Sequence, residues 1–234
     1  LPCVNRLTKA TTALAAKTSR IAAAAYVATA AIDTWFAGAE APDAKRIRLI
    51  TKSALMPLLA LASRPAPAKL FAAQGFSWGG DVALLADGEA AFLGGAGSFG
   101  IAHGAYWSLW RERRDRSRSL WSRPSTKVLA AGVGAAAPVI AIASGRKDPV
   151  LGGAVAAYSV ALTAVAAQAL ALSDEVDPQA RRLIGAGALA FLASDTILGA
   201  NMFVLPQRSA VAERAVMATY TIAQGLLAAG VRRL

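Results

Sequence analysis

Eight apolar runs follow one another along the sequence, and all but the short second run, over residues 49–63, are about as long as a membrane-spanning helix. At about 1.5 Å per residue, roughly 20 apolar residues in a helix cross a hydrocarbon core about 30 Å thick. Hydrophobic residues make up 56% of the chain, which agrees with lipid as the solvent of its surface. We predict an all-α polytopic membrane protein, a bundle of about eight transmembrane helices that forms one domain over residues 1–234. The predicted spans are residues 21–39, 49–63, 70–86, 90–110, 128–144, 149–172, 183–204 and 212–231.

The net charge of +11 and the basic stretch from Arg111 to Lys127 are compatible with nucleic acid or with a membrane surface. Lys and Arg collect in the cytoplasmic loops of membrane proteins. With the N-terminus inside, 17 of the 25 Lys and Arg residues fall on the cytoplasmic side, 7 on the other side, and Lys52 within a span. We therefore predict a bacterial inner-membrane protein with both termini and the basic loop 111–127 in the cytoplasm. This loop is expected to meet anionic lipids, and no nucleic-acid partner is predicted.

The first twenty residues contain no apolar signal-peptide region, so we expect residues 1–20 to form an N-terminal cytoplasmic segment. The single cysteine, Cys3, excludes an intramolecular disulfide. The sequence predicts no oligomeric state.

A few polar side chains interrupt the apolar spans, and such residues are expensive in lipid and often functional. Asp81 and Asp195 each lie about 12 residues, roughly 18 Å, beyond the cytoplasmic start of their spans, so they share a depth. Tyr220 and Gln224, four residues apart on one helix face, reach about the same level from the outer side. We predict a buried polar chamber with two carboxylates. The polar residues singled out within the spans are Asp33, Lys52, Ser77, Asp81, His103, Ser194, Asp195, Asn201, Tyr220 and Gln224.

A purely structural interpretation remains open for these groups. Asp81 and Asp195 could pair with Lys52 or with backbone groups and thereby fix the register of the helices. Asp33, close to the outer interface, favours a role in helix packing, and a lone histidine such as His103 is more often a bundle residue than a ligand.

Five segments resemble, in order and spacing, the signature segments of the YhhN family, which includes the lysoplasmalogenases of animals. They are "TKSALMPLLALA" (51–62), "FSWGGDVALL" (76–85), "FLGGAGSFGIAHGAYW" (92–107), "AGALAFLASDTILGANMFV" (186–204) and "VMATYTIAQGLLAAG" (216–230). The resemblance implies an eight-helix membrane hydrolase that cleaves the vinyl ether of lysoplasmalogens and releases a fatty aldehyde and a glycerophospho-base. It implies a lysophospholipid substrate with membrane lipids as surroundings, and we expect the reaction to require neither a metal nor another cofactor.

Vinyl ether hydrolysis needs an acid that protonates carbon and an anion that stabilises the resulting oxocarbenium ion. Two carboxyl groups in unlike environments suit these roles, as in glycosidases, and an apolar bundle disfavours the charged form of a carboxyl group. We therefore expect Asp81 and Asp195 to be catalytic, in an undecided order. The expected supporting or substrate-binding residues are Lys52, Ser77, His103, Ser194, Asn201, Tyr220 and Gln224.

Three alternatives stay open. Paired acids within a membrane are equally typical of a proton-coupled lipid or small-molecule carrier. Asp81, His103 and Asp195 could instead serve a metal-dependent lipid hydrolase. A hydrolase of the same kind could also cleave an ester or amide of another lysolipid.

Overall fold

The computed structural model describes residues 2–234, with side chains from residue 13 onward, and this part of the chain forms eight α-helices and no β-strand. The predicted all-α membrane bundle is confirmed; the expectation for Cys3 falls on a side chain outside the described ones. The helices are α1 (Pro2–Phe36), α2 (Ala44–Ala62), α3 (Ala68–Ala83), α4 (Glu89–Arg113), α5 (Pro124–Gly145), α6 (Pro149–Ala169), α7 (Pro178–Gly199) and α8 (Ala210–Val231). Two short turns complete the order: the 3-10 turn η1 (Leu120–Ser122) before α5 and the π-helical turn η2 (Ala200–Val204) after α7.

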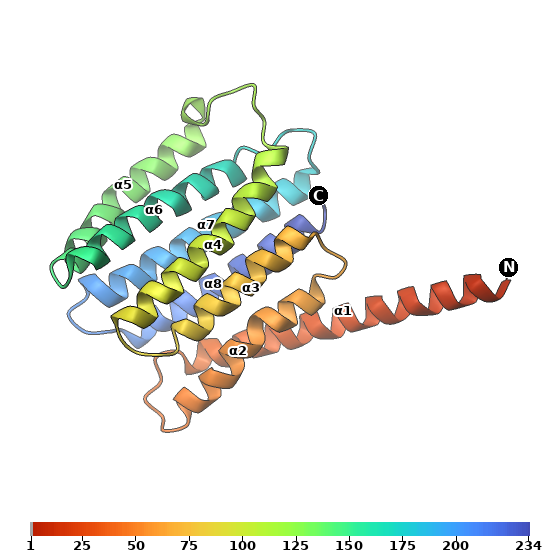
Figure 1. The fold of residues 1–234 in the computed structure, drawn as a ribbon, viewed down its shortest axis with the longest axis horizontal. Coiled ribbons are helices and arrows are strands. Elements are labelled where there is room, and N and C mark those ends of the chain that lie inside the picture. The colour runs from red at the N-terminus through yellow and green to blue at the C-terminus, as the bar shows by residue number, and fades with distance from the viewer. Residues whose placement is uncertain (1) are drawn as a thin grey trace.

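Seven of the helices close into a ring. Packing runs from α1 to α2, α3 and α4, passes from α4 to α6, and returns through α7 and α8 to α1. Helix α5 lies at the edge of the bundle and packs against α6 and η2 (Figure 1). The interior of the ring is therefore reached by side chains from seven helices, and α5 covers one side of it.

Sequence signals at the helix starts account for the later helices. Pro124, Pro149 and Pro178 occupy the first turns of α5, α6 and α7, where a missing N–H costs nothing. The Asp148 carboxylate accepts bonds from the backbone N–H groups of Val150 and Leu151 and so caps α6. These signals explain why α5 and α7 begin before the apolar runs predicted at 128 and 183.

Small residues let the helices approach closely, as the Ala- and Gly-rich composition predicts. A Cβ on Gly80 of α3 would lie 2.6 Å from the Phe99 ring of α4. A Cβ on Gly187 of α7 would lie 2.9 Å from Cγ of Leu227 on α8. Glycine is needed at both positions for helix contact.

Three helical segments of the described chain are long and apolar enough to cross a membrane: Pro124–Gly145, Pro149–Ala169 and Pro178–Val204. Two of the earlier helices are shorter or more charged than these three segments. Helix α3 has only 16 residues, and α2 carries four basic side chains, Lys45, Arg46, Arg48 and Lys52. Large apolar side chains such as Val128, Ile142 and Val160 point outward on α5 and α6. An outward apolar surface of this kind is that of a membrane bundle.

The basic segment predicted as a loop over residues 111–127 is partly helical. Helix α4 continues to Arg113, and α5 already begins at Pro124. The start of the α4–α5 connection is hydrogen-bonded to the α6–α7 connection. Asp115 N donates to Ala171 O at 2.9 Å, and Ser173 N donates to Arg113 O at 2.9 Å. The described backbone of the N-terminal segment 1–20 belongs to α1.

Candidate active site

Asp81 on α3 is buried in the ring and has two partners from other helices. Its Oδ2 accepts a 2.6 Å hydrogen bond from the Tyr220 hydroxyl on α8. Lys52 Nζ on α2 lies 3.8 Å from Oδ1, which is an ion pair longer than a hydrogen bond. Lys52 is itself 7% exposed, so α2 supplies the counter-charge that a buried carboxylate needs.

Gln224 of α8 links the surroundings of Asp81 to one further helix, α4, and makes a second contact with α3. Its Nε2 donates to Ser77 Oγ at 3.0 Å and lies 3.5 Å from the Tyr220 hydroxyl. Its Oε1 accepts a 2.9 Å bond from the Tyr106 hydroxyl on α4. The amide thus has a donor side and an acceptor side, both occupied, and it fixes the position of Tyr220 beside Asp81.

Asp195 on α7 has a separate set of partners. The Tyr158 hydroxyl on α6 donates to its Oδ2 at 2.5 Å, and His103 Nε2 on α4 lies 3.2 Å from the same hydroxyl. Since the Tyr158 proton goes to the carboxylate, the imidazole must donate through Nε2–H. In this arrangement His103 carries a proton on Nε2, and its buried Nδ1 has no partner among the described residues.

Aromatic rings pack between the hydrogen-bonded residues around Asp81 and those around Asp195. Phe191 of α7 lies with its ring centroid 4.7 Å from that of His103 and 5.6 Å from that of Tyr220. Phe99 of α4 packs edge to face against both Phe191, at 6.0 Å, and Tyr220, at 5.8 Å. This apolar partition keeps the Tyr158 and Tyr220 hydroxyls in separate hydrogen-bond groups.

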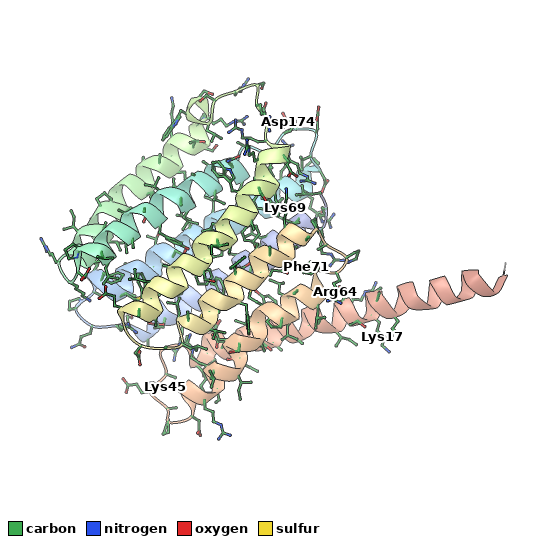
Figure 2. All side chains as sticks on the ribbon, viewed as in Figure 1. Lys17, Lys45, Arg64, Lys69, Phe71 and Asp174 are labelled. Carbon is green, nitrogen blue, oxygen red and sulfur yellow. The ribbon has the colours of Figure 1, made fainter. Side chains whose placement is uncertain are left out.

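One cavity nevertheless reaches both carboxylates. It has a volume of about 690 Å³ and is lined by residues of all seven ring helices, including Lys52, Asp81, Ser194, Asp195 and Tyr220. Its other walls come from the α1–α2, α3–α4 and α7–α8 connections, so it opens at that end of the bundle. Figure 2 shows Lys45, which lines this cavity, at the end of the bundle opposite Lys69 and Asp174.

A second, apolar cavity of about 80 Å³ borders Asp195 and Tyr158 on the side of α5. Its walls include Val133, Ala136 and Ile140 of α5. Asp195 therefore lies at the boundary between a polar cavity and an apolar one.

The remaining polar residues singled out from the sequence hydrogen-bond to groups other than the two carboxylates. Ser194 lines the large cavity, but its hydroxyl donates to Val216 O at 3.1 Å and joins α7 to α8. Asn201 orders the α7–α8 turn, since it donates to Glu213 at 3.0 Å and accepts from Ser209 N at 2.8 Å. Asp33 accepts a 2.6 Å bond from Thr51, which connects α1 with α2.

Tyr158 and Tyr106 are site residues that the sequence reasoning missed. Both are hydroxyl groups in the middle of apolar runs, so the rule that selected Tyr220 would also have selected them. Nothing in the sequence indicates that Tyr158 meets Asp195, because α6 reaches the ring next to α4 with α5 intervening along the chain.

In the described part of the chain, no three His, Cys, Asp or Glu side chains come close enough together to hold a metal ion. His103 meets Asp195 only through Tyr158.

A family model, that of the YhhN family, matches residues 47–231. The match runs from α2 to α8 and includes Asp81, Asp195 and the residues that hydrogen-bond or pair with them. No match was found among curated proteins or among solved structures.

Proposed function

The chain belongs to the YhhN family, and we propose that it is a membrane-embedded hydrolase that cleaves the vinyl ether bond of a lysoplasmalogen or a related lysolipid. We further propose that it lies in a bacterial inner membrane with both termini in the cytoplasm. The observation that carries the proposal is the pair of carboxyl groups on one cavity with unlike partners: a cation beside Asp81, and a hydroxyl group and an apolar wall beside Asp195.

The unlike partners suggest a division of roles. Lys52 favours the charged form of Asp81, and an ionised carboxylate can stabilise an oxocarbenium ion. No cation forms a salt bridge with Asp195 in the described residues, so a proton is the simplest way to neutralise it beside the apolar cavity. Tyr158 engages Oδ2 and leaves Oδ1 to carry that proton. We assign Asp195 as the general acid and Asp81 as the stabilising carboxylate.

The reaction then balances with one water. Asp195 gives its proton to the vinyl carbon that does not bear oxygen, and the oxygen-bearing carbon becomes an oxocarbenium ion beside the Asp81 carboxylate. Water adds to this carbon and returns a proton to Asp195. The hemiacetal collapses as its hydroxyl proton passes to the glycerol oxygen, the C–O bond breaks, and aldehyde and glycerophospho-base leave.

The test is fatty aldehyde release from a lysoplasmalogen by the purified protein in detergent. We expect Asp195→Asn and Asp81→Asn each to lower turnover by about 100-fold or more. Asp43→Asn is the matched control, because Asp43 precedes α2 without a side-chain capping bond and outside the cavity. Chelator should leave the rate unchanged.

Three results would contradict the proposal. Asn variants that stay within a few-fold of the parent would exclude the paired-carboxyl mechanism, and loss of activity with chelator would favour the metal-dependent alternative. A folded parent that releases no aldehyde but moves lysolipid across liposomes would be a carrier.

A further inference from the structure

Helix α2 presents three basic side chains to the large cavity. Lys45, Arg48 and Lys52 are spaced at i, i+3 and i+7, which places them on one helix face, and all three line the cavity wall. Arg46 lies between them in sequence but is exposed and does not line the cavity. The cations therefore form a stripe that leads from the exposed Lys45 to the buried Lys52.

The protein's own acids leave hydrogen-bond donors of this stripe unused. The Thr51 hydroxyl donates a 2.6 Å hydrogen bond to Asp33 Oδ1, while Arg48 Nε lies 3.7 Å from the same oxygen. Arg48 Nε is buried without a hydrogen-bond partner in the described chain. Lys52 Nζ lies at a similar distance, 3.8 Å, from Asp81 Oδ1. Since buried charged donors are almost always paired, the unpartnered Nε of Arg48 indicates an anionic ligand.

Other acids of the cavity do not occupy the stripe. Asp87 and Glu89 belong to the α3–α4 connection, and Glu213 is bound by Asn201. Among the described residues, none of these three forms a salt bridge with Lys45, Arg48 or Lys52. Lys45 has no salt bridge in the described chain, and the long Arg48–Asp33 and Lys52–Asp81 ion pairs leave both of those cations within reach of a ligand in the cavity.

We propose that Lys45, Arg48 and Lys52 form a phosphate-binding subsite that takes the phosphate of a lysolipid headgroup. Arg offers forked donors to phosphate oxygens and Lys a point charge, so the chemistry of the stripe fits this group. Lys52 would then lie between the phosphate and Asp81 and fix the distance from headgroup to carboxylate. The lipid source of the phosphate rests on the proposed function; the anion subsite itself does not.

The experiment measures binding without chemistry. A saturated alkyl-ether lysophosphocholine has no vinyl bond, and the matching alkylglycerol lacks only the phosphocholine. Both are titrated calorimetrically into the purified full chain in the same detergent. We expect the parent to bind the phosphate-bearing ether at least about tenfold more tightly, and Arg48→Gln to remove most of that preference while leaving alkylglycerol binding unchanged. Arg46→Gln, which removes the same charge from the same helix, should keep the preference.

Equal affinity of the parent for both ethers, or equal effects of Arg48→Gln and Arg46→Gln, would overturn the subsite. Lys52→Met should also lower the preference for the phosphate-bearing ether. If that variant does not fold, Arg48→Gln and Arg48→Lys still test the subsite, and Arg48→Lys should keep part of the preference. Competition by inorganic phosphate or glycerophosphocholine at lysolipid concentrations would support an anion site and overturn its lipid assignment. A retained phosphate preference in a protein that releases no aldehyde would refute the vinyl ether activity and leave the subsite standing.

Discussion

The Tyr158 hydroxyl on α6 donates a 2.5 Å hydrogen bond to Asp195 Oδ2 on α7. His103 from α4 supports the same hydroxyl at 3.2 Å, so three helices determine where this carboxyl group points. Because Oδ2 is engaged, only Oδ1 remains for substrate. Tyr158 is in this sense a positioning residue for the proposed acid.

Replacement of Tyr158 by Phe tests that relationship. The ring is kept and one hydrogen bond to the neutral carboxyl group is lost, which is worth about 0.5–1.5 kcal/mol and corresponds to a rate loss of roughly 2- to 10-fold. We expect kcat to fall by this factor with little change in KM. Ser159→Ala is the control, since Ser159 lines the same apolar cavity but donates only to Val155 O. Parent-like turnover of Tyr158→Phe would exclude the positioning role.

The Lys52–Asp81 pair predicts non-additive effects on stability. Lys52→Met leaves a buried carboxylate without its cation and should destabilise the protein by about 3 kcal/mol. Adding Asp81→Asn removes that charge and should recover most of the loss. The measurement is unfolding of the single and double variants in detergent, with the exposed Lys45→Met as control. Simple addition of the two single effects would show that the pair is not coupled.

The apolar cavity beside Asp195, of about 80 Å³, predicts a site for part of the hydrocarbon chain. Ala136→Phe on α5 should fill it and lower kcat/KM for long-chain substrates by about tenfold, because a well-packed apolar site rejects added bulk. Ala135→Phe is the matched control, because Ala135 is exposed and lies outside the cavity wall. Rates compared across a series of chain lengths give the measurement. The same loss in both variants would place the chain elsewhere.

The connection after α4 predicts a pH dependence. Ser117 donates side-chain and backbone hydrogen bonds to Asp115, Arg123 pairs with the same carboxylate, and these contacts lower the pKa of Asp115 to about 2. An unfolded Asp has a pKa of about 3.9, so this stabilisation is complete above pH ~4 and is lost as the pH falls through about 2. Carbon-13 NMR of labelled Asp carboxyl groups in micelles measures the titration, and Ser117→Ala should raise the pKa. A parent midpoint near pH 4 would contradict the contacts.

The proposed orientation places the cavity mouth outside and the basic connection inside. In a Cys3→Ser background, Asp87→Cys at the mouth and Arg118→Cys in the basic connection are both exposed positions. An impermeant thiol reagent should label the first in intact bacterial spheroplasts and the second only after lysis. The reverse pattern would invert the orientation.

Much of the architecture follows from local sequence features. Apolar runs, Pro at first helical turns and Asp148 as a cap place the later helices to within a few residues. Departures occur where local signals are weak. Helix α4 continues to Arg113 in a basic stretch, and the seventh helix ends in the π-helical turn at Ala200, which no residue pattern marks.

Part of the site was also predictable. Asp81, Tyr220 and Gln224 were placed at one depth by counting residues from the span ends, and the structure brings all three together with Ser77. Depth alone could not separate Asn201, which orders the α7–α8 turn, from residues that face the cavity.

The sequence by itself determined that this chain is a helical membrane bundle with a few buried polar groups, because hydropathy and helix rise are local properties. Only the tertiary structure decided which of those groups meet. The contact between Tyr158 and Asp195 requires α6 to pack beside α4 and α7, and the unequal surroundings of the two carboxyl groups depend on Lys52 facing Asp81 alone. Such contacts between side chains depend on the order of the helices in the ring and on the rotation of each helix about its own axis. Both arise from the packing of small residues along whole faces, not from any single segment.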